Sequence, residues 1–304
     1  MNMLTQNQID AIIDTVVAEL QRQGVVRNER RFVPSSASDV ASLALDLPDI
    51  TTPAYRARSY VENARKPDVL RALMQTTPAR IGIGHAGPRY RNIPQFIFWA
   101  DHAVTQDALF KEIDPALLEQ FNLFEVQSQA SNRQEYLLRP DLGRKLSDAA
   151  KKTLQERCVK NPDVQVYVSD GLSAAAIEHN LRDMLPVIQQ GLQQAGLKMG
   201  TPFYVKYGRV GLLNDVNAIV DAKVVVTLIG ERPGLGRAEA MSAYMGFRPQ
   251  PDSSDADRDV VCNIFNGGTN PLEAGAYVVE YIKRMLKQGA SGIKLKLIEQ
   301  AGNK

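Results

Sequence analysis

The chain has 304 residues, of which 44% are hydrophobic and 23% are charged, a composition typical of a globular protein of one or two domains. Its 36 Lys and Arg residues against 34 Asp and Glu residues leave a net charge of +2, which excludes general attraction to polyanions as a basis for nucleic-acid binding. The sequence contains no apolar run of about 18 residues, so we expect no membrane span, and Cys158 and Cys262 are predicted to be free thiols in a reducing cytoplasm.

Residues 1–24 are predicted to form an amphipathic helix. Thr5 and Gln8 form a capping box at its start, and Gly24 ends it. Its apolar stripe, with steps of three and four, consists of Ile9, Ile12, Ile13, Val16, Val17 and Leu20. This stripe either folds back on the protein or docks into a groove of another protein. Residues 25–50 have the polar composition of a flexible linker.

Residues 51–160 are predicted to be a mainly helical region. Helical patterns occupy residues 67–74 and 94–100, and a third pattern begins at Arg139 and runs toward Cys158.

Residues 161–304 are predicted to be an α/β domain, because strand and helix patterns alternate from Asn161 onward. Strands are expected at residues 164–168, 203–207, 223–230 and 260–265. Helices are expected at residues 173–195, around Val216 and Ile219, and from an N-cap at Asn270. The alternation predicts an open, mainly parallel Rossmann-like sheet flanked by helices, preceded by the helical region and the N-terminal amphipathic helix.

The loops after the strands are the expected binding region, since ligands of open α/β sheets collect beyond the carboxyl ends of the strands. Four loops should line one crevice: residues 169–171, 207–210, 230–236 and 263–268. Within the third loop, Pro233 and Gly234 suit the central positions of a type II turn. Such a turn would hold the carboxylate of Glu231 in place, and the alternative is a tight connection with a solvated Glu231.

No catalytic set or metal site is expected. Glu239 occupies the place of the third glycine of a dinucleotide fingerprint, and Ser173 is better interpreted as a helix N-cap than as a nucleophile. Asp170, Glu231 and Asp257 could act as bases, but nothing fixes a nucleophile or metal beside them. The three histidines are not spaced as metal ligands. The four loops, with no catalytic set of their own, predict a broad binding surface rich in backbone amides.

Five motifs, in this order, resemble the small subunit of ethanolamine ammonia-lyase. They are RPDLGR (139–144), VSDGLS (168–173), YGRV (207–210), GERPGLG (230–236) and GGTNP (267–271), and the similarity runs from about Arg65 to Lys294. The resemblance implies a lyase subunit in an adenosylcobalamin-dependent radical conversion of ethanolamine to acetaldehyde and ammonia. It also implies a hetero-oligomer, in which a large subunit carries the substrate-binding barrel and the small subunit covers the cofactor.

The resemblance implies cofactor contacts at Val210, Glu231 and Val260. The family pattern places a cysteine where this chain has Val260, and the nearest cysteine here is Cys262. Base-off cobalamin proteins supply a histidine from an Asp-x-His-x-x-Gly motif, and Asp101-His102 lacks the intervening residue. We therefore expect the cofactor to be bound base-on, with dimethylbenzimidazole on cobalt.

In the same family an N-terminal extension is associated with packaging, which favours the docking interpretation of residues 1–24. The expected partners of this helix are shell or cargo proteins of a bacterial microcompartment, and the expected location is the bacterial cytoplasm within that compartment. Two alternatives remain for the chain as a whole. One is a non-enzymatic corrinoid carrier, and the other is a stand-alone nucleotide-binding α/β enzyme, against which the missing third glycine argues.

Overall fold

The computed structural model describes residues 48–77 and 79–302. The helix expected over residues 1–24 and nearly all of the linker expected over 25–50 lie outside the described residues. The chain divides into two compact units, Met1–Asp49 and Ile50–Lys304, and all elements below belong to the second.

The second unit begins with four short elements, and side chains from this region form hydrogen bonds with the long helix that follows. The short elements are α3 (Pro53–Arg56), α4 (Pro67–Thr76), β1 (His85–Ala86) and β2 (Arg89–Tyr90), followed by α5 (Asn92–Phe110). Asp101 of α5 is buried and accepts hydrogen bonds from Arg56, at 2.6 and 3.0 Å, and from Arg80. Burial acts to raise the pKa of Asp101, but the two guanidinium groups outweigh it and lower that pKa. The helices predicted at residues 67–74 and 94–100 are thus confirmed, the second within a much longer helix.

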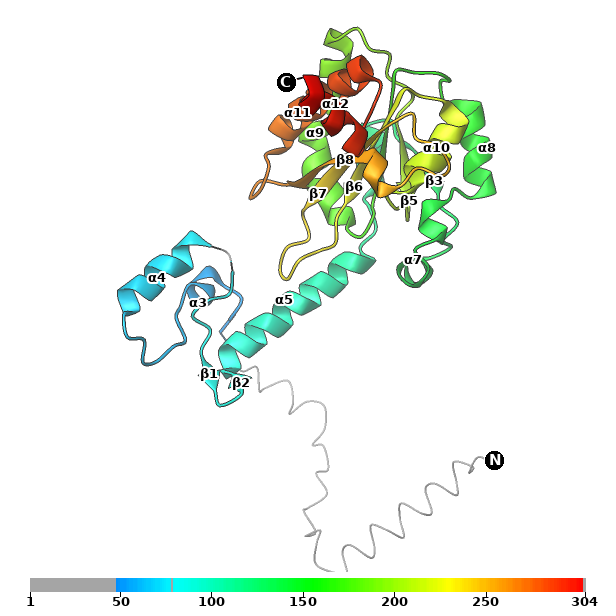
Figure 1. The fold of residues 1–304 in the computed structure, drawn as a ribbon. Coiled ribbons are helices and arrows are strands. Elements are labelled where there is room, and N and C mark those ends of the chain that lie inside the picture. Colours follow the sequence, from blue (N-terminus) through cyan, green and yellow to red (C-terminus); the bar gives the residue numbers. More distant parts are fainter. Residues whose placement is uncertain (1–47, 78, 303–304) are drawn as a thin grey trace, which may run out of the picture. The chain divides into compact units, whose positions relative to one another are not determined.

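A six-stranded mixed sheet forms the centre of the unit (Figure 1). In spatial order its strands are β3 (Phe124–Gln127), β5 (Phe203–Lys206), β4 (Val164–Ser169), β6 (Val224–Gly230), β7 (Met241–Phe247) and β8 (Arg258–Ile264). The first four are parallel to one another, whereas β7 is antiparallel to both β6 and β8. Because β7 is antiparallel to both of its neighbours, β8 runs in the same direction as β6.

Strands β4, β5, β6 and β8 confirm the four predicted strands, whereas β3 and β7 were not predicted. β3 has only four residues and lies in a region whose other patterns are helical. β7 has the sequence MSAYMGF, which contains no β-branched residue. The expectation of a mainly parallel sheet therefore holds for β3 to β6, and the inserted β7 makes the sheet mixed.

The helices around the sheet are α6 (Pro115–Gln120), α7 (Arg133–Leu138), α8 (Asp148–Arg157), α9 (Ala174–Gln194), α10 (Leu212–Val220), α11 (Pro271–Gln288) and α12 (Gly292–Gly302). Among them, α9 and α11 begin where the sequence predicts, whereas α8 begins at Asp148 rather than at Arg139, and α6, α7 and α12 were not predicted. The side chain of Ser173 accepts a hydrogen bond from the N–H of Ala176, and that of Asn270 accepts one from the N–H of Leu272. Both predicted N-caps are confirmed.

Two apolar cores lie on opposite faces of the sheet. One joins the sheet to α9, α11 and α12, and the other joins β3, β5, β4 and β6 to α8 and α10. β4 and β6 are buried along their whole length, which accounts for their nearly continuous apolar sequence. On the α10 side, β8 keeps exposed residues, with Val260 47% exposed and Cys262 exposed. Both Cys158 and Cys262 are free, as predicted.

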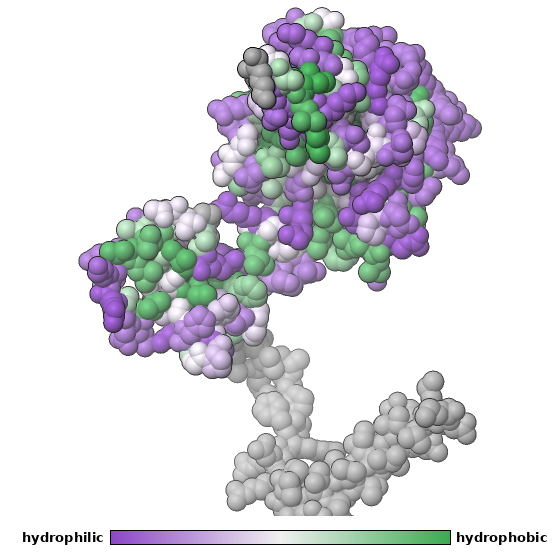
Figure 2. All heavy atoms as spheres, in the orientation of Figure 1, coloured by the Kyte–Doolittle hydropathy of each residue, from purple (hydrophilic) through white to green (hydrophobic). Residues whose placement is uncertain are grey.

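Large apolar side chains are exposed on the first helices of the unit. Val69 and Leu73 of α4 and Phe96 and Trp99 of α5 are each 46–58% exposed. Figure 2 shows hydrophobic surface over α4 and the segments beside it. Within the described ranges, no helix is both long and apolar enough to cross a membrane.

Candidate functional site

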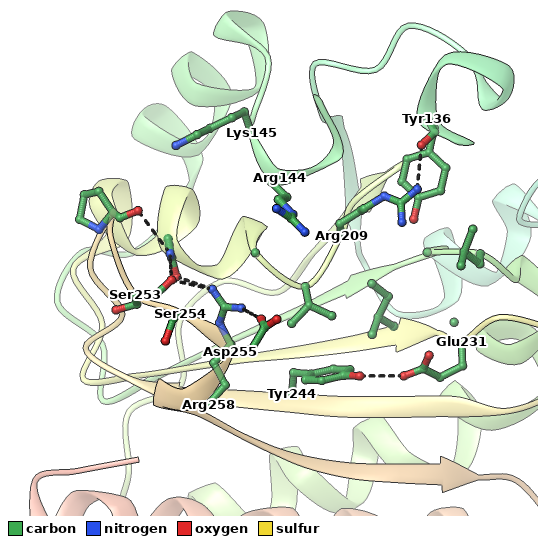
Figure 3. A pocket seen from close by; sticks show the side chains of 18 residues that line it. Tyr136, Arg144, Lys145, Arg209, Glu231, Tyr244, Ser253, Ser254, Asp255 and Arg258 are labelled. Carbon is green, nitrogen blue, oxygen red and sulfur yellow. Dashed lines mark hydrogen bonds and ion pairs between the residues drawn. The ribbon is translucent and has the colours of Figure 1, made fainter. Parts of the chain in front are cut away.

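A cavity of about 590 Å³ extends from the ends of β4, β5 and β6 along the face of β7 to the start of β8 (Figure 3). It is lined by Tyr136, Arg144, Lys145, Gly171, Leu172, Arg209, Val210, Gly211, Asn214, Ile229, Gly230, Glu231, Tyr244, Pro251, Ser253, Ser254, Asp255 and Arg258. Three of the four loops expected to line a crevice, those after β4, β5 and β6, contribute to it.

The fourth expected loop, residues 263–268, does not line this cavity. Strand β7 lies between β6 and β8, so the loop after β8 is two strands away from the loop after β6. At about 4.8 Å per strand, the separation is roughly 10 Å. The segment of residues 251–258, which leads from β7 into β8, lines the cavity instead.

The three residues singled out for cofactor contact divide between the cavity and the surface beside it. Val210 and Glu231 line the cavity, although they follow different strands. Val260 does not line it, but pairs in register with Tyr244, which does. Since paired residues of neighbouring strands share a face of the sheet, Tyr244 and exposed Val260 form a shelf that continues from the cavity. We call Tyr244, Val260 and Cys262 the β7–β8 shelf.

Glu231 is held at both its backbone and its side chain. Its N–H donates to the carbonyl oxygen of Ala240 at 3.0 Å, and the hydroxyl of Tyr244 donates to its Oε1 at 3.1 Å. Burial, with the nearby charge of Glu231, raises the pKa of Tyr244 to about 12, so this hydroxyl stays protonated at neutral pH. Oε1 is thus occupied, whereas Oε2 accepts no hydrogen bond within the described residues and can accept one from a ligand.

The turn that follows Glu231 differs from the predicted one. Gly234 does not have a positive φ, so Pro233 and Gly234 are not the central residues of a type II turn. The turn instead spans Gly234 to Arg237, closed by a 3.1 Å hydrogen bond from the N–H of Arg237 to the oxygen of Gly234, with Gly236 at φ +71°. Gly236 occupies the third position of this turn, where a positive φ is required, so the turn depends on Gly236 rather than on Gly234. The hydroxyl of Thr105 in α5 also donates to the oxygen of Gly234 at 3.0 Å, which fastens the loop to that helix.

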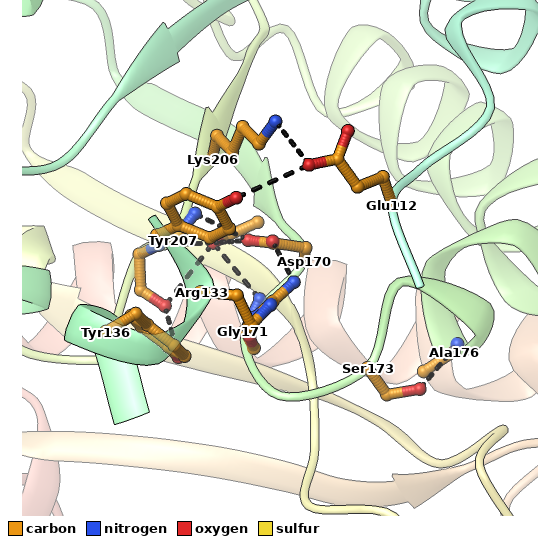
Figure 4. A network of polar contacts seen from close by, with 11 residues as sticks. Glu112, Arg133, Tyr136, Asp170, Gly171, Ser173, Ala176, Lys206 and Tyr207 are labelled. Carbon is orange, nitrogen blue, oxygen red and sulfur yellow. Dashed lines mark hydrogen bonds and ion pairs between the residues drawn. The ribbon is translucent and has the colours of Figure 1, made fainter. Parts of the chain in front are cut away.

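A buried ion pair positions two of the loops that line the cavity (Figure 4). Arg133 of α7 donates to Oδ2 of Asp170 at 2.6 Å and to the carbonyl oxygen of Gly171 at 2.7 Å. The N–H of Tyr207 donates to Oδ1 of Asp170 at 2.7 Å. One carboxylate therefore ties α7 to the loops after β4 and β5.

This geometry removes two of the three candidate bases from contact with a ligand. Asp170 is 1% exposed, and its two oxygens are occupied by Arg133 and Tyr207. Asp257 accepts hydrogen bonds from the N–H and the hydroxyl of Ser254 in a capping box. Only Glu231 among the three faces the cavity.

Several cavity residues were given no role from the sequence, among them Tyr136, Arg144 and Arg209, although Arg209 lies in a loop that was predicted to line the crevice. Arg209 donates to the carbonyl oxygen of Tyr136 at 2.9 Å and stacks on its ring, 4.5 Å from the centroid. Arg144 lies in the RPDLGR motif and Arg209 in the YGRV motif, so the sequence contained a signal for both arginines. That these motifs meet depends on β3, which brings residues 128–147 beside the end of β5.

In the part of the chain that the structure describes, no group of three or more His, Cys, Asp or Glu residues is placed to bind a metal ion. His85, His102 and His179 lie outside the cavity lining. The ring of His179 instead contacts the carbonyl oxygen of Ala175, at 2.7 Å from Nδ1.

Comparison with known families assigns most of the chain to one family. Residues 67–296 match the family model of the ethanolamine ammonia-lyase light chain (EutC). The match covers more than half of the chain, so the protein belongs to this family, and the resemblance found in the sequence is confirmed. Membership makes the chain a subunit of a lyase of ethanolamine and implies a large subunit as its partner.

Proposed function

We propose that this light chain binds adenosylcobalamin in the base-on form and covers it at the interface with the large subunit of an ethanolamine ammonia-lyase. The observation that supports this proposal most strongly is the convergence of Val210 and Glu231 on one cavity, next to the exposed β7–β8 shelf. The chain is then an accessory subunit, inactive alone, in the radical conversion of ethanolamine to acetaldehyde and ammonia.

The chemistry of the site fits this cofactor. Cobalamin is a wide disc fringed with amide groups, and it carries one phosphodiester in its nucleotide loop. The free Oε2 of Glu231 can accept an amide N–H, and hydrogen bonds to a charged acceptor contribute about 1.5–3 kcal/mol. Val210 offers apolar surface and main-chain groups, and the exposed side chain of Val260 offers apolar surface on the shelf. A cavity that opens onto a flat shelf suits a ligand larger than the cavity itself.

The role of this chain is to bind and orient, while the bound cofactor supplies the radical chemistry. The hydroxyl groups that pair with carboxylates here have structural roles, because Ser254 and Asp257 form a capping box and Tyr244 holds Glu231 in place. Glu231, fixed by Tyr244, would hold the rim of the ring in a set orientation. The shelf would cover an apolar part of the ring and exclude water from it.

The positions of the histidines support base-on binding. His85 and His102 are exposed, His179 is occupied by a contact within its own helix, and none of the three lines the cavity. No histidine of this chain is therefore placed to displace dimethylbenzimidazole. Electron paramagnetic resonance with isotopically labelled histidine should show no protein nitrogen on cobalt.

Residues 1–24 are proposed to determine where the enzyme lies in the cell. Their apolar stripe supports docking to shell or cargo proteins, which would place the enzyme within a microcompartment of the bacterial cytoplasm.

The variant Glu231→Gln tests the cofactor site in the complex purified with its large subunit. Losing the charged acceptor should raise the Kd for cobalamin by about tenfold. The KM for ethanolamine should stay within about twofold, since the substrate site is assigned to the large subunit. Corrinoid retained after gel filtration and steady-state kinetics measure the two effects.

Glu239→Gln is the matched control, because Glu239 is exposed, follows the same strand and lies outside the cavity lining. It should leave both constants unchanged. A Glu231→Gln variant that keeps its cofactor but loses affinity for ethanolamine would refute the assigned role.

Titration of the isolated chain with adenosylcobalamin separates a subunit from a corrinoid carrier. We expect tight binding only in the presence of the large subunit, because the shelf covers one side of the ring. Equally tight binding by the chain alone would favour the carrier.

A further inference from the structure

Two arginines in the cavity lack a carboxylate partner. Its lining contains four cationic residues, Arg144, Lys145, Arg209 and Arg258, and two carboxylates, Glu231 and Asp255. Lys145 pairs with Asp215 at 3.3 Å, and Arg258 pairs with Asp255. Within residues 48–77 and 79–302, neither Arg144 nor Arg209 forms an ion pair, which leaves positive charge uncompensated in this cavity.

The two side chains are held close together by their loops. The N–H of Arg209 donates to the carbonyl oxygen of Gly143 at 2.8 Å. A Cβ on Gly143 would lie 2.8 Å from Cγ of Arg209, and a Cβ on Gly211 would lie 3.2 Å from Cγ of Arg144. Each arginine therefore packs over the backbone beside the other. In the view of Figure 3 both lie on one side of the cavity, with Glu231 and Tyr244 on the other.

Arg209 also carries a buried donor that has no acceptor. Its Nε is shielded from solvent and forms no hydrogen bond within the described residues, although another guanidinium nitrogen donates to Tyr136. A buried polar atom without a partner destabilises the folded protein, so the wall that carries Arg209 has unmet hydrogen-bonding capacity. The N-terminus of α10 begins beside Arg209, and its dipole adds partial positive charge at the same wall.

We propose that Arg144 and Arg209 form a binding site for the phosphodiester of the cofactor's nucleotide loop. Guanidinium groups match the geometry of phosphate oxygens through paired N–H donors. A single anion between the two arginines would relieve their mutual repulsion. This inference rests on the proposed cobalamin site and extends it, because it assigns the end of the cavity opposite Glu231 to the nucleotide loop.

Three corrinoids test the assignment in the complex of the full chain with the large subunit. Cobalamin and cobinamide phosphate both carry a phosphate, whereas cobinamide lacks it. Arg144→Gln and Arg209→Gln should each raise the Kd of the two phosphate-bearing corrinoids by about tenfold, and leave the Kd of cobinamide within about twofold. Equilibrium binding followed by absorbance measures this difference without any turnover.

Arg139→Gln is the control, since it removes an exposed cation of the same RPDLGR motif that pairs with Asp141 and lies outside the cavity lining. It should change all three Kd values by less than about twofold. Arg144 is exposed, so Arg144→Gln is expected to fold and decides the question even if Arg209→Gln does not.

The outcomes separate this inference from the proposed function. If the unaltered complex binds none of the three corrinoids, both are overturned. If it binds cobalamin but Arg144→Gln affects cobinamide as strongly as cobalamin, or affects neither, the phosphate site is overturned and the cobalamin site stands.

Discussion

At the scale of single residues, one carboxylate determines the shape of the cavity wall. Asp170 joins α7 to the ends of β4 and β5 through Arg133 and the N–H of Tyr207. Burial raises the pKa of Asp170 to about 6, and the neighbouring Arg133 guanidinium only partly offsets this effect. Ionised Asp170 thus orders the binding loops at a cost to stability.

This cost predicts a dependence on pH. Between its ordinary value of 3.8 and about 6, folded Asp170 holds a proton more firmly than unfolded Asp170. The contribution of this group to the unfolding free energy therefore falls as pH rises through that window. Asp170→Asn cannot titrate, so the unfolding free energy of the unaltered protein minus that of the variant should decrease from pH 4 to pH 7. Urea unfolding at several pH values measures this difference.

Asp252→Asn, at an exposed carboxylate, provides the comparison for the same measurement. A difference for Asp170→Asn that increases between pH 4 and pH 7 would show that its folded pKa is lowered rather than raised.

At the scale of elements, α5 connects the start of the unit to the loop that carries Glu231. Its buried Asp101 binds Arg56 and Arg80, and its Thr105 binds the oxygen of Gly234. Phe96, Trp99 and Phe110 fall on one exposed side of the helix by their spacing of three and eleven residues. An apolar stripe beside the loop that carries Glu231 is well placed for the subunit that closes over the cofactor.

We therefore predict that α5 contacts the large subunit. Trp99 is 58% exposed, and buried tryptophans are frequent hot spots at interfaces, so Trp99→Ser should weaken the two-subunit complex by roughly tenfold or more. Analytical ultracentrifugation of the mixed subunits measures this. Leu297→Ser is the control, because Leu297 is 60% exposed on α12, which packs on the face of the sheet opposite the cavity. Equal weakening by both variants would contradict a specific role for α5.

At the scale of the whole molecule, the segment proposed for targeting and the candidate site belong to different units. The boundary between the two compact units lies at Asp49 and Ile50, and the complete cavity belongs to the second unit. Removal of residues 1–24 should therefore leave the unit that holds the candidate site intact.

Deleting residues 1–24 should preserve cobalamin affinity and lyase activity of the purified complex, and should abolish co-localisation with the shell in cells. Corrinoid titration and fluorescence microscopy of tagged protein measure the two properties. The assignment would be reversed by a truncated chain that is still packaged but no longer active.

The sequence could predict those features that depend on neighbouring residues. The strands β4, β5, β6 and β8 and the N-caps Ser173 and Asn270 follow from local periodicity and side-chain chemistry, and the structure confirms them. The same local reasoning missed β3 and β7, because a short or unbranched strand is defined by the strands it pairs with. It also misplaced the turn after Glu231, where either glycine of the motif could have met the requirement for positive φ.

By itself, the sequence determined the family, the α/β class and the loops that carry Val210 and Glu231, since all of these are written in ordered motifs and short-range patterns. Only the tertiary structure decided which loops share a cavity: β7 moves residues 263–268 away from it, and β3 brings Arg144 beside Arg209. The physical reason is that pairing between distant strands depends on contacts across the sheet, and no local pattern of residues encodes them.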